Sequence, residues 1–327
     1  MVADASPLVT LVRKLDTVPL PPAPGGRGWP HIYPDRLILK ALVIMLVRQL
    51  PTVHSLLAVL AEPTPEMAQL RALVTDAQGR FPARRTWERR LGALAARLPA
   101  IIKGLGHHVL AHLDPWPHGG RAAAIDSTLL RARGGVWHKK HREEGVVPHT
   151  SIDTDAGWTK SGWHGWVYGW KLHLAVTVSE TVWLPLAAEA TPANAADNVE
   201  APALLAGLPR DVSAVLGDQH YNDPALAAQV VGEGRLLITT KRGPYPHTDD
   251  GVEVRRIFHQ LRSHAIENFN GQFKDMFGCL GAVPTKGEVA TQRFILGAAF
   301  LYQLIVLHQH QAGRSPRVGL KPFLLAA

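Results

Sequence analysis

Three acidic residues stand in settings that suit metal-dependent chemistry. Asp126 ends an apolar run in AAAIDSTLL, and Asp218 ends a second one in SAVLGDQHYN. Glu267 lies in a segment of helical periodicity, HAIENFNGQFKDMF, among basic and aromatic residues. Two strand-end aspartates and one helix glutamate can hold a pair of Mg²⁺ ions, for which Mn²⁺ can substitute, and such a pair catalyses in-line phosphoryl transfer. We therefore interpret these acids as a catalytic and metal-binding set.

The two aspartates are expected at one edge of a sheet. Each follows a buried strand pattern and precedes polar residues, and ligands usually bind at strand ends in open α/β sheets. Like charges at short distance need a cation between them. Either aspartate alone fits a turn or cap residue equally well, but their combination with Glu267 favours a metal site.

The helix that carries Glu267 also has a strong apolar side, made of Ile266, Phe269, Phe273 and Phe277. This side predicts that the helix packs on the sheet and directs Glu267 inward, although a solvated helix face is the alternative. Lys274 lies two turns further along the face of Glu267, where its ammonium group could hold a phosphate of a bound strand.

The elements that must position these residues follow from the periodicity of the chain. The patterns predict strands at 121–130, 170–179, 181–191, 212–218 and 235–241, and helices at 198–208, 224–234, 263–277 and 289–311. This order predicts an α/β domain over residues 120–312, with a mixed sheet covered by helices, followed by a tail at 313–327.

The N-terminal third predicts a separate helical domain. Residues 1–34 are rich in Pro and Gly and predict an extended arm. Residues 35–113 have helical periodicity punctuated by prolines and predict an all-helical domain. A basic cluster near one helix start, Arg84, Arg85, Arg89 and Arg90, leaves two hypotheses open. The domain is either a bundle that only packs or a helix-turn-helix reader of DNA ends.

Bulk composition limits the class of protein. The net charge of +8 and the pI of about 9.8 favour an anionic partner. The single cysteine, Cys279, excludes an internal disulfide and a Cys-rich zinc site. The N-terminal segment predicts no signal peptide, and the most apolar run, 37–50, is too short to span a bilayer. We therefore expect a cytoplasmic protein without a membrane partner.

A basic, tryptophan-rich insertion is expected at about 131–166. Lys and Arg neutralise phosphates, and indole rings can stack on unpaired bases, so this stretch predicts a grip on a DNA end. The alternatives are core tryptophans and a plain solvated loop. His220, just after Asp218, either touches the scissile phosphate or only lines the site. The remaining candidate DNA contacts in and near the insertion are His138, Lys139, Lys140, Arg142, Trp163, Trp166 and Lys171.

The order of two strand aspartates and a helix glutamate, with E-x6-K from Glu267 to Lys274, resembles the DDE transposases of bacterial insertion sequences, of the IS4 and IS5 type. YGWKLHL at 168–174 resembles the strand that follows the first aspartate in this family, and GDQHYND at 217–223 resembles the strand and turn that hold the second. The resemblance covers residues 120–310 and implies an RNase H-like catalytic core. The family often has Arg four residues before the Glu; here Ser263 stands there, and Arg262, one residue earlier, is the candidate for that DNA contact.

The resemblance implies a mechanism and partners. Asp126, Asp218 and Glu267 would bind two Mg²⁺ ions, water would cut at the element end, and the freed 3′-hydroxyl would attack target DNA. Double-stranded DNA of both kinds is the implied partner, with at least a homodimer on DNA. Two alternatives remain open: an RNase H-like nuclease without strand transfer, and an inert transposase-derived protein that only binds DNA.

Overall fold

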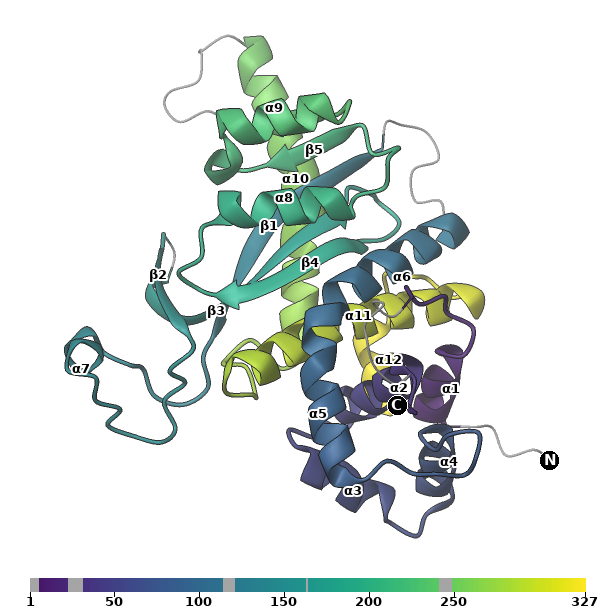
Figure 1. Cartoon of the computed structure of the whole chain (residues 1–327). Coiled ribbons are helices and arrows are strands. Elements are labelled where there is room, and N and C mark those ends of the chain that lie inside the picture. Colours follow the sequence, from purple (N-terminus) through teal and green to yellow (C-terminus); the bar gives the residue numbers. More distant parts are fainter. Residues whose placement is uncertain (1–5, 23–31, 114–120, 163, 241–248) are drawn as a thin grey trace. The chain divides into compact units, whose positions relative to one another are not determined.

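The computed structural model describes residues 6–22, 32–113, 121–162, 164–240 and 249–327, with side chains from 256 onward in the last range. The chain forms two compact units (Figure 1). One comprises residues 110–288 and contains the sheet. The other comprises residues 1–109 and 289–327 and is helical.

The sheet has six strands in a mixed arrangement. Its strands are β1 (Ala122–Arg131), β2 (Gly157–Ser161), β3 (Gly165–Thr177), β4 (Pro185–Pro192), β5 (Ala214–Gly217) and β6 (Leu236–Thr239). Strand β1 is antiparallel to β3 and parallel to β5, while β3 also pairs with β2 and β4, and β5 with β6. The order β4-β3-β1-β5-β6 with these strand directions is RNase H-like, so the predicted fold class is confirmed.

Helices cover the two faces of this sheet. Helix α8 (Asp197–Gly207) contacts β4, β3 and β1, and α9 (Pro224–Gly232) contacts β6. Helix α10 (Asp249–Met276) contacts β1, β3 and β5, and Figure 1 shows it behind the sheet with α8 in front. The side chains of Ile266, Phe269 and Phe273 are fully buried, which confirms the predicted apolar side of the helix.

The insertion between β1 and β3 is more ordered than expected. It contains the short helix α7 (Lys139–Glu143) and strand β2. Asp153 is fully buried at its base, where it accepts hydrogen bonds from the Trp170 indole (3.2 Å) and the Gly287 amide (3.1 Å). The Arg133 guanidinium donates to the Pro284 carbonyl at 2.8 Å. These contacts fasten the insertion to the chain segment that follows α10.

The helical unit has different boundaries from the predicted helical domain, 35–113. Its helices are α1 (Pro7–Lys14), α2 (Asp35–Val47), α3 (Val53–Leu60), α4 (Pro65–Leu73), α5 (Arg84–Leu94), η1 (Ala95–Arg97), α6 (Leu98–Leu113), α11 (Glu288–Gln311) and α12 (Leu320–Ala326). The expected arm, 1–34, thus contains a packed helix, α1, and the expected tail, 313–327, contains α12. Residues 289–312, expected in the sheet domain, instead pack with the N-terminal helices.

Helix α11 explains this correction. It is apolar on nearly every side, and Gln303 donates a hydrogen bond to the Ile102 carbonyl of α6 at 2.9 Å. Within the described part of the chain, α11 alone is long and apolar enough to cross a membrane, but 72% of that window is buried inside the protein. A core helix passes the same test of length and composition, so this is weak support for a membrane span.

Candidate active site

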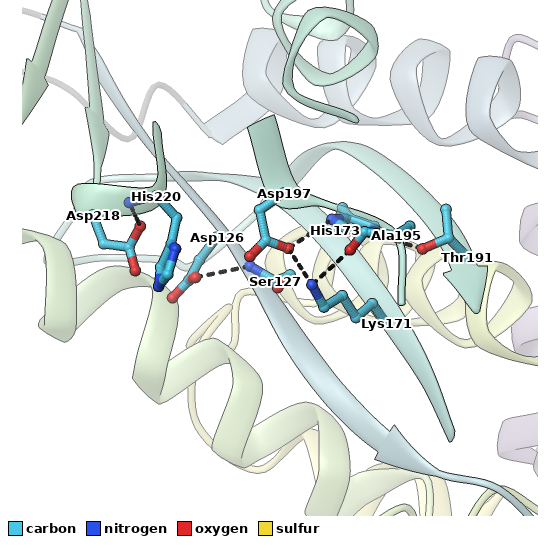
Figure 2. A network of polar contacts seen from close by, with 9 residues as sticks. All are labelled: Asp126, Ser127, Lys171, His173, Thr191, Ala195, Asp197, Asp218 and His220. Atoms are coloured by element: carbon cyan, nitrogen blue, oxygen red, sulfur yellow. Dashed lines mark hydrogen bonds and ion pairs between the residues drawn. The ribbon is translucent and has the colours of Figure 1, made fainter. Parts of the chain in front are cut away.

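Asp126 and Asp218 stand at equivalent points of neighbouring strands. Ala124 of β1 is paired with Leu216 of β5, and each aspartate follows two residues further along its strand. Asp218 is the first residue beyond β5 and caps the 3-10 helix Gln219–Tyr221, because its Oδ1 accepts the His220 amide at 2.8 Å. Figure 2 shows the two carboxylates side by side, with the ring of His220 directed towards Asp126.

The environment of Asp126 disfavours the ionised carboxylate unless a cation lies beside it. Burial raises the pKa of Asp126 to about 6; the nearby Arg262 opposes this shift, while Asp218 adds to it. A buried carboxylate with a second carboxylate beside it gains from any cation that can lie between them. The donor chemistry at this point of the sheet therefore fits a divalent cation.

Arg262 joins Asp126 to Glu267. Its Nη2 lies 2.6 Å from Asp126 Oδ2, and its Nη1 lies 4.0 Å from Glu267 Oε1. Glu267 also accepts a hydrogen bond from the Ser263 hydroxyl at 3.0 Å, and its side chain is 63% exposed. Helix α10 thus carries Glu267 to the same side of the sheet as Asp126, with a guanidinium between the two carboxylates.

This arrangement is not a closed metal centre. Among the described residues, no three His, Cys, Asp or Glu side chains are close enough together to hold a metal ion as they stand. Asp126 and Asp218 are carboxylates at equivalent positions of neighbouring strands, as a shared cation requires. The Arg262 guanidinium shows that a positive charge fits between Asp126 and Glu267. Glu267 joins the two aspartates around one cation only if Arg262 leaves that position.

Asp197, which the sequence patterns did not single out, lies next to this group. It is the first residue of α8, and its Oδ1 lies 2.9 Å from the Lys171 ammonium and 3.5 Å from His173 Nδ1. Lys171 also donates to the Ala195 carbonyl at 2.8 Å, and His173 Nε2 is 2.8 Å from the Thr191 hydroxyl. A carboxylate in the first turn of a helix is a recognisable sequence signal, but its neighbours on β3 are not.

Two predicted DNA contacts have structural partners instead. Lys171 is only 8% exposed, and its ammonium donates hydrogen bonds to Asp197 and to the Ala195 carbonyl. It therefore forms an internal ion pair instead of the expected phosphate contact. In the helical unit, Arg90 is buried and paired with Asp35, which removes it from the basic cluster considered for DNA reading.

The remaining candidates keep access to solvent to different degrees. Lys274 is half-buried, and burial lowers its pKa. Trp166 is 65% exposed on β3, whereas Trp163 lies outside the described residues. The predicted DNA contacts of the insertion and of the turn after β5 that are exposed are His138, Lys139, Lys140, Arg142 and His220.

Three of the tryptophans in this stretch have structural roles. The Trp137 indole donates to the Val146 carbonyl at 2.8 Å, and the Trp158 indole donates to the Trp137 carbonyl at 2.8 Å. Trp170 is fully buried and donates to Asp153. Their large apolar area therefore holds the insertion and the strands together.

The strand order and the paired aspartates define an RNase H-like domain with an acidic centre. A family model described as "Transposase DDE domain" matches residues 117–304, more than half of the chain, so this chain belongs to that family. Among solved structures, the chain matches the piggyBac transposase synaptic complex with hairpin DNA and the Mos1 transposase paired-end complex with left transposon end.

These structural similarities are distant. The piggyBac match has 10% sequence identity and a TM-score of 0.41, and covers 98% of this chain and 79% of that one. The Mos1 match has 11% identity and a TM-score of 0.23, and covers 85% and 97%. No curated protein matches this chain. The family assignment therefore rests on the family model.

Proposed function

We propose that this protein is an insertion-sequence transposase that cuts DNA at the ends of its element and joins the freed 3′-hydroxyl to target DNA. The observation that carries the proposal is the adjacency of Asp126 and Asp218 at the end of β5, with Glu267 brought to the same side by α10. Membership of the transposase DDE domain family supports it.

Each acidic residue has a defined role in this proposal. Asp126, Asp218 and Glu267 would hold Mg²⁺, or Mn²⁺ in its place, which supplies a Lewis acid for activating water and for stabilising the leaving oxygen. Arg262 neutralises Asp126 and Glu267 as long as no other cation lies there. Once released, its planar guanidinium is suited to a phosphate of the bound strand.

The partners follow from the same proposal. We infer that double-stranded DNA of element ends and target binds across the acidic centre and the exposed basic insertion, and that the protein acts on DNA at least as a homodimer in the cytoplasm. The positive net charge supports an anionic partner.

The test is a cleavage and joining assay. The purified chain is incubated in Mg²⁺ with a labelled element end and a target plasmid, and Asp126→Asn, Asp218→Asn and Glu267→Gln are each expected to lower both products by at least about 10³-fold. Asp275→Asn, which changes an exposed carboxylate on the same helix, serves as the control.

The products separate the candidate functions. Joined products support a transposase, and cut ends without joining support a metal-dependent nuclease. DNA binding without either product, in Mg²⁺ and in Mn²⁺, supports an inert DNA-binding protein and rejects the proposal.

A further inference from the structure

We propose that Asp197 is a fourth carboxylate of the cation site, supplied by α8 and fixed by Lys171, and that it acts as a positioning residue through the water shell of the cation. This inference rests on the proposed function, since it adds a residue to the same site. The acidic triad by itself assigns Asp197 no role.

The placement of Asp197 is the first argument. Helix α8 contacts β1 and the 3-10 helix after Asp218 as well as β3 and β4. Its first residue, Asp197, lies against Lys171 and His173 of β3, and His173 is paired with Ser127, the neighbour of Asp126. The Asp197 side chain is 17% exposed, and its charge contributes to the raised pKa of Asp126. Figure 2 shows Asp218, Asp126 and Asp197 in a row, and the Asp197 oxygen that does not contact Lys171 lies on the side of Asp126.

The local charge balance is the second argument. Four carboxylates gather here, Asp126, Asp197, Asp218 and Glu267, and the positive charges beside them are Lys171 and Arg262. Burial lowers the pKa of His173 to about 4, so this imidazole adds no positive charge near neutral pH. With Arg262 in place the surplus is two negative charges, and it is three once Arg262 leaves. In either state Asp197 adds one negative charge that favours a bound cation.

Tyr221 supplies an independent indication of a bound group. Its side chain is fully buried, and its hydroxyl has no hydrogen-bond partner among the described residues. Burial and then the charges of Asp126, Asp197 and Asp218 raise the pKa of Tyr221, so the phenol lies near all three carboxylates and remains a neutral donor. A buried hydroxyl without a partner is destabilising, and a hydrogen bond to a water of the cation shell would remove that cost.

An indirect contact fits the geometry better than direct coordination. As they stand, no three acidic side chains of the described chain are close enough to share one ion, and one Asp197 oxygen already accepts from Lys171. Residues that act through the shell around a metal commonly change its affinity by about 10–100-fold when they are altered.

The experiment measures Mn²⁺ binding to the full chain without DNA, by calorimetric titration at pH 8. Asp197→Asn keeps an oxygen that can accept from Lys171 but loses the charge, so Mn²⁺ affinity is expected to fall about 10–100-fold. The metal-free Tm is expected to fall as well, because Lys171 loses its charged partner, so the titration is run well below the Tm of the variant. Glu200→Gln, in the first turn of the same helix, is the matched control and is expected to bind Mn²⁺ as the wild type does.

The outcomes separate this inference from the proposed function. If Asp126→Asn abolishes Mn²⁺ binding and Asp197→Asn leaves it unchanged, Asp197 is only the structural partner of Lys171, and the inference is wrong while the function stands. If the wild type binds no Mn²⁺, both fail. Should Asp197→Asn not fold, Tyr221→Phe replaces it, with a loss of about tenfold supporting the inference and unchanged affinity overturning it.

Discussion

At Asp126, burial and a guanidinium act on one carboxylate in opposite directions. Burial raises its pKa, and Arg262, at 2.6 Å, stabilises the ionised form. Arg262 is itself buried, so if one partner of this ion pair were removed, water could not fully solvate the charge of the other. Removal of one member of such a pair leaves an uncompensated buried charge, which costs more than the pair contributes.

This pair predicts how Arg262→Gln changes stability with pH. Without the guanidinium, the pKa of Asp126 in the folded state rises further above its ordinary value of 3.8. A carboxyl group with a raised folded-state pKa stabilises the fold below its unfolded-state pKa, and this contribution is lost as the pH rises through the folded-state pKa. We therefore expect a loss of about 3 kcal/mol at pH 8 and a smaller loss at pH 5.

Thermal unfolding at both pH values, with and without Mn²⁺, checks this prediction. Mn²⁺ is expected to raise the Tm of Arg262→Gln more than that of the wild type, because the cation takes the place of the guanidinium. Arg256→Gln on the exposed side of α10 is the control. An equal loss of stability at pH 5 and pH 8 would show that the guanidinium acts through packing rather than charge.

The sequence could reveal part of this centre because some of its signals are local. An acid at the end of an apolar run marks Asp126 and Asp218 without knowledge of the fold. The ion pair between Lys171 and Asp197 spans 26 positions, and the pair between Arg262 and Asp126 spans 136, so both depend on which elements pack together. For this reason the sequence predicts Lys171 as a DNA contact, whereas in the structure it forms an ion pair with Asp197 inside the protein.

At the scale of elements, β4 carries a half-buried acid opposite a neutral histidine. Glu189 is paired in register with His173 of β3. Burial raises the pKa of Glu189 to about 7, with a smaller contribution from Glu200, and His173 cannot compensate because burial keeps it neutral. This part of the sheet is therefore more stable with Glu189 protonated.

Glu189→Gln mimics the protonated acid and should stabilise the protein at high pH. The folded-state pKa of about 7 lies above the ordinary value of 4.5, so wild-type stability is lost as the pH rises through 7. The gain from the substitution should be near zero at pH 4.5 and about 1–2 kcal/mol at pH 8, after allowance for partial solvent screening. Urea unfolding at the two pH values measures it, with the exposed Glu180→Gln as control. A gain that is the same at both pH values would contradict the assignment.

Helix α8 approaches β4 so closely that its last residue must be small. A Cβ added at Gly207 would lie 2.4 Å from the Cβ of Ala187, and neither atom belongs to a flexible side chain. Gly207→Ala is therefore expected to shift α8 and to cost about 1–3 kcal/mol. Because α8 carries Asp197, Mn²⁺ affinity should fall as well.

Gly232→Ala is the matched control for this helix contact. Gly232 also ends a helix, α9, and a Cβ there would meet no atom within 4 Å. The control is expected to change stability by less than about 0.5 kcal/mol. Calorimetric Tm values and Mn²⁺ titrations of both variants provide the measurement, and a loss of similar size in the two would reject close packing as the cause.

The elements that the sequence predicted are those with their own periodicity. The strands and helices predicted over residues 120–312 correspond to β1, β3, β4, β5, β6, α8, α9, α10 and α11. Strand β2, with the sequence GWTKS, has no such pattern and exists because it pairs with the start of β3. Helix α1 was hidden by the Pro-rich composition around it, although its buried residues have helical spacing.

At the scale of the whole molecule, the chain does not divide where composition suggests. The helical unit is built from both ends of the sequence, and the family match at 117–304 crosses the boundary between the units. Helix α11 has no polar face that would indicate its neighbours, so its grouping with the N-terminal helices could not be predicted from periodicity. The hydrophobic pattern identified the helix but not its unit.

If the protein binds DNA as proposed, its affinity should depend on salt, and the insertion provides a local test. Lys139, Lys140 and Arg142 are exposed on α7, and the Trp137 and Trp158 hydrogen bonds hold the chain around this helix. Lys139 lies 3.7 Å from Glu143, and the Arg142 guanidinium lies 5.9 Å from the centre of the Trp137 ring. If α7 lies on DNA phosphates, replacing the three by Ala should weaken binding uniformly across sequences. The slope of log Kd against log salt should then fall by about 2–3, because each lost phosphate contact releases about one fewer counterion.

A charge-retaining variant separates this electrostatic effect from a change in shape. The triple replacement Lys139→Arg, Lys140→Arg and Arg142→Lys keeps three positive charges and should keep the wild-type slope, since the term depends on the number of neutralised phosphates. Fluorescence anisotropy with a duplex between about 50 and 200 mM salt measures both variants. An unchanged slope in the Ala variant would place α7 away from DNA, leaving Trp166, Lys274 and the surroundings of Asp126 as the remaining candidate contact surface.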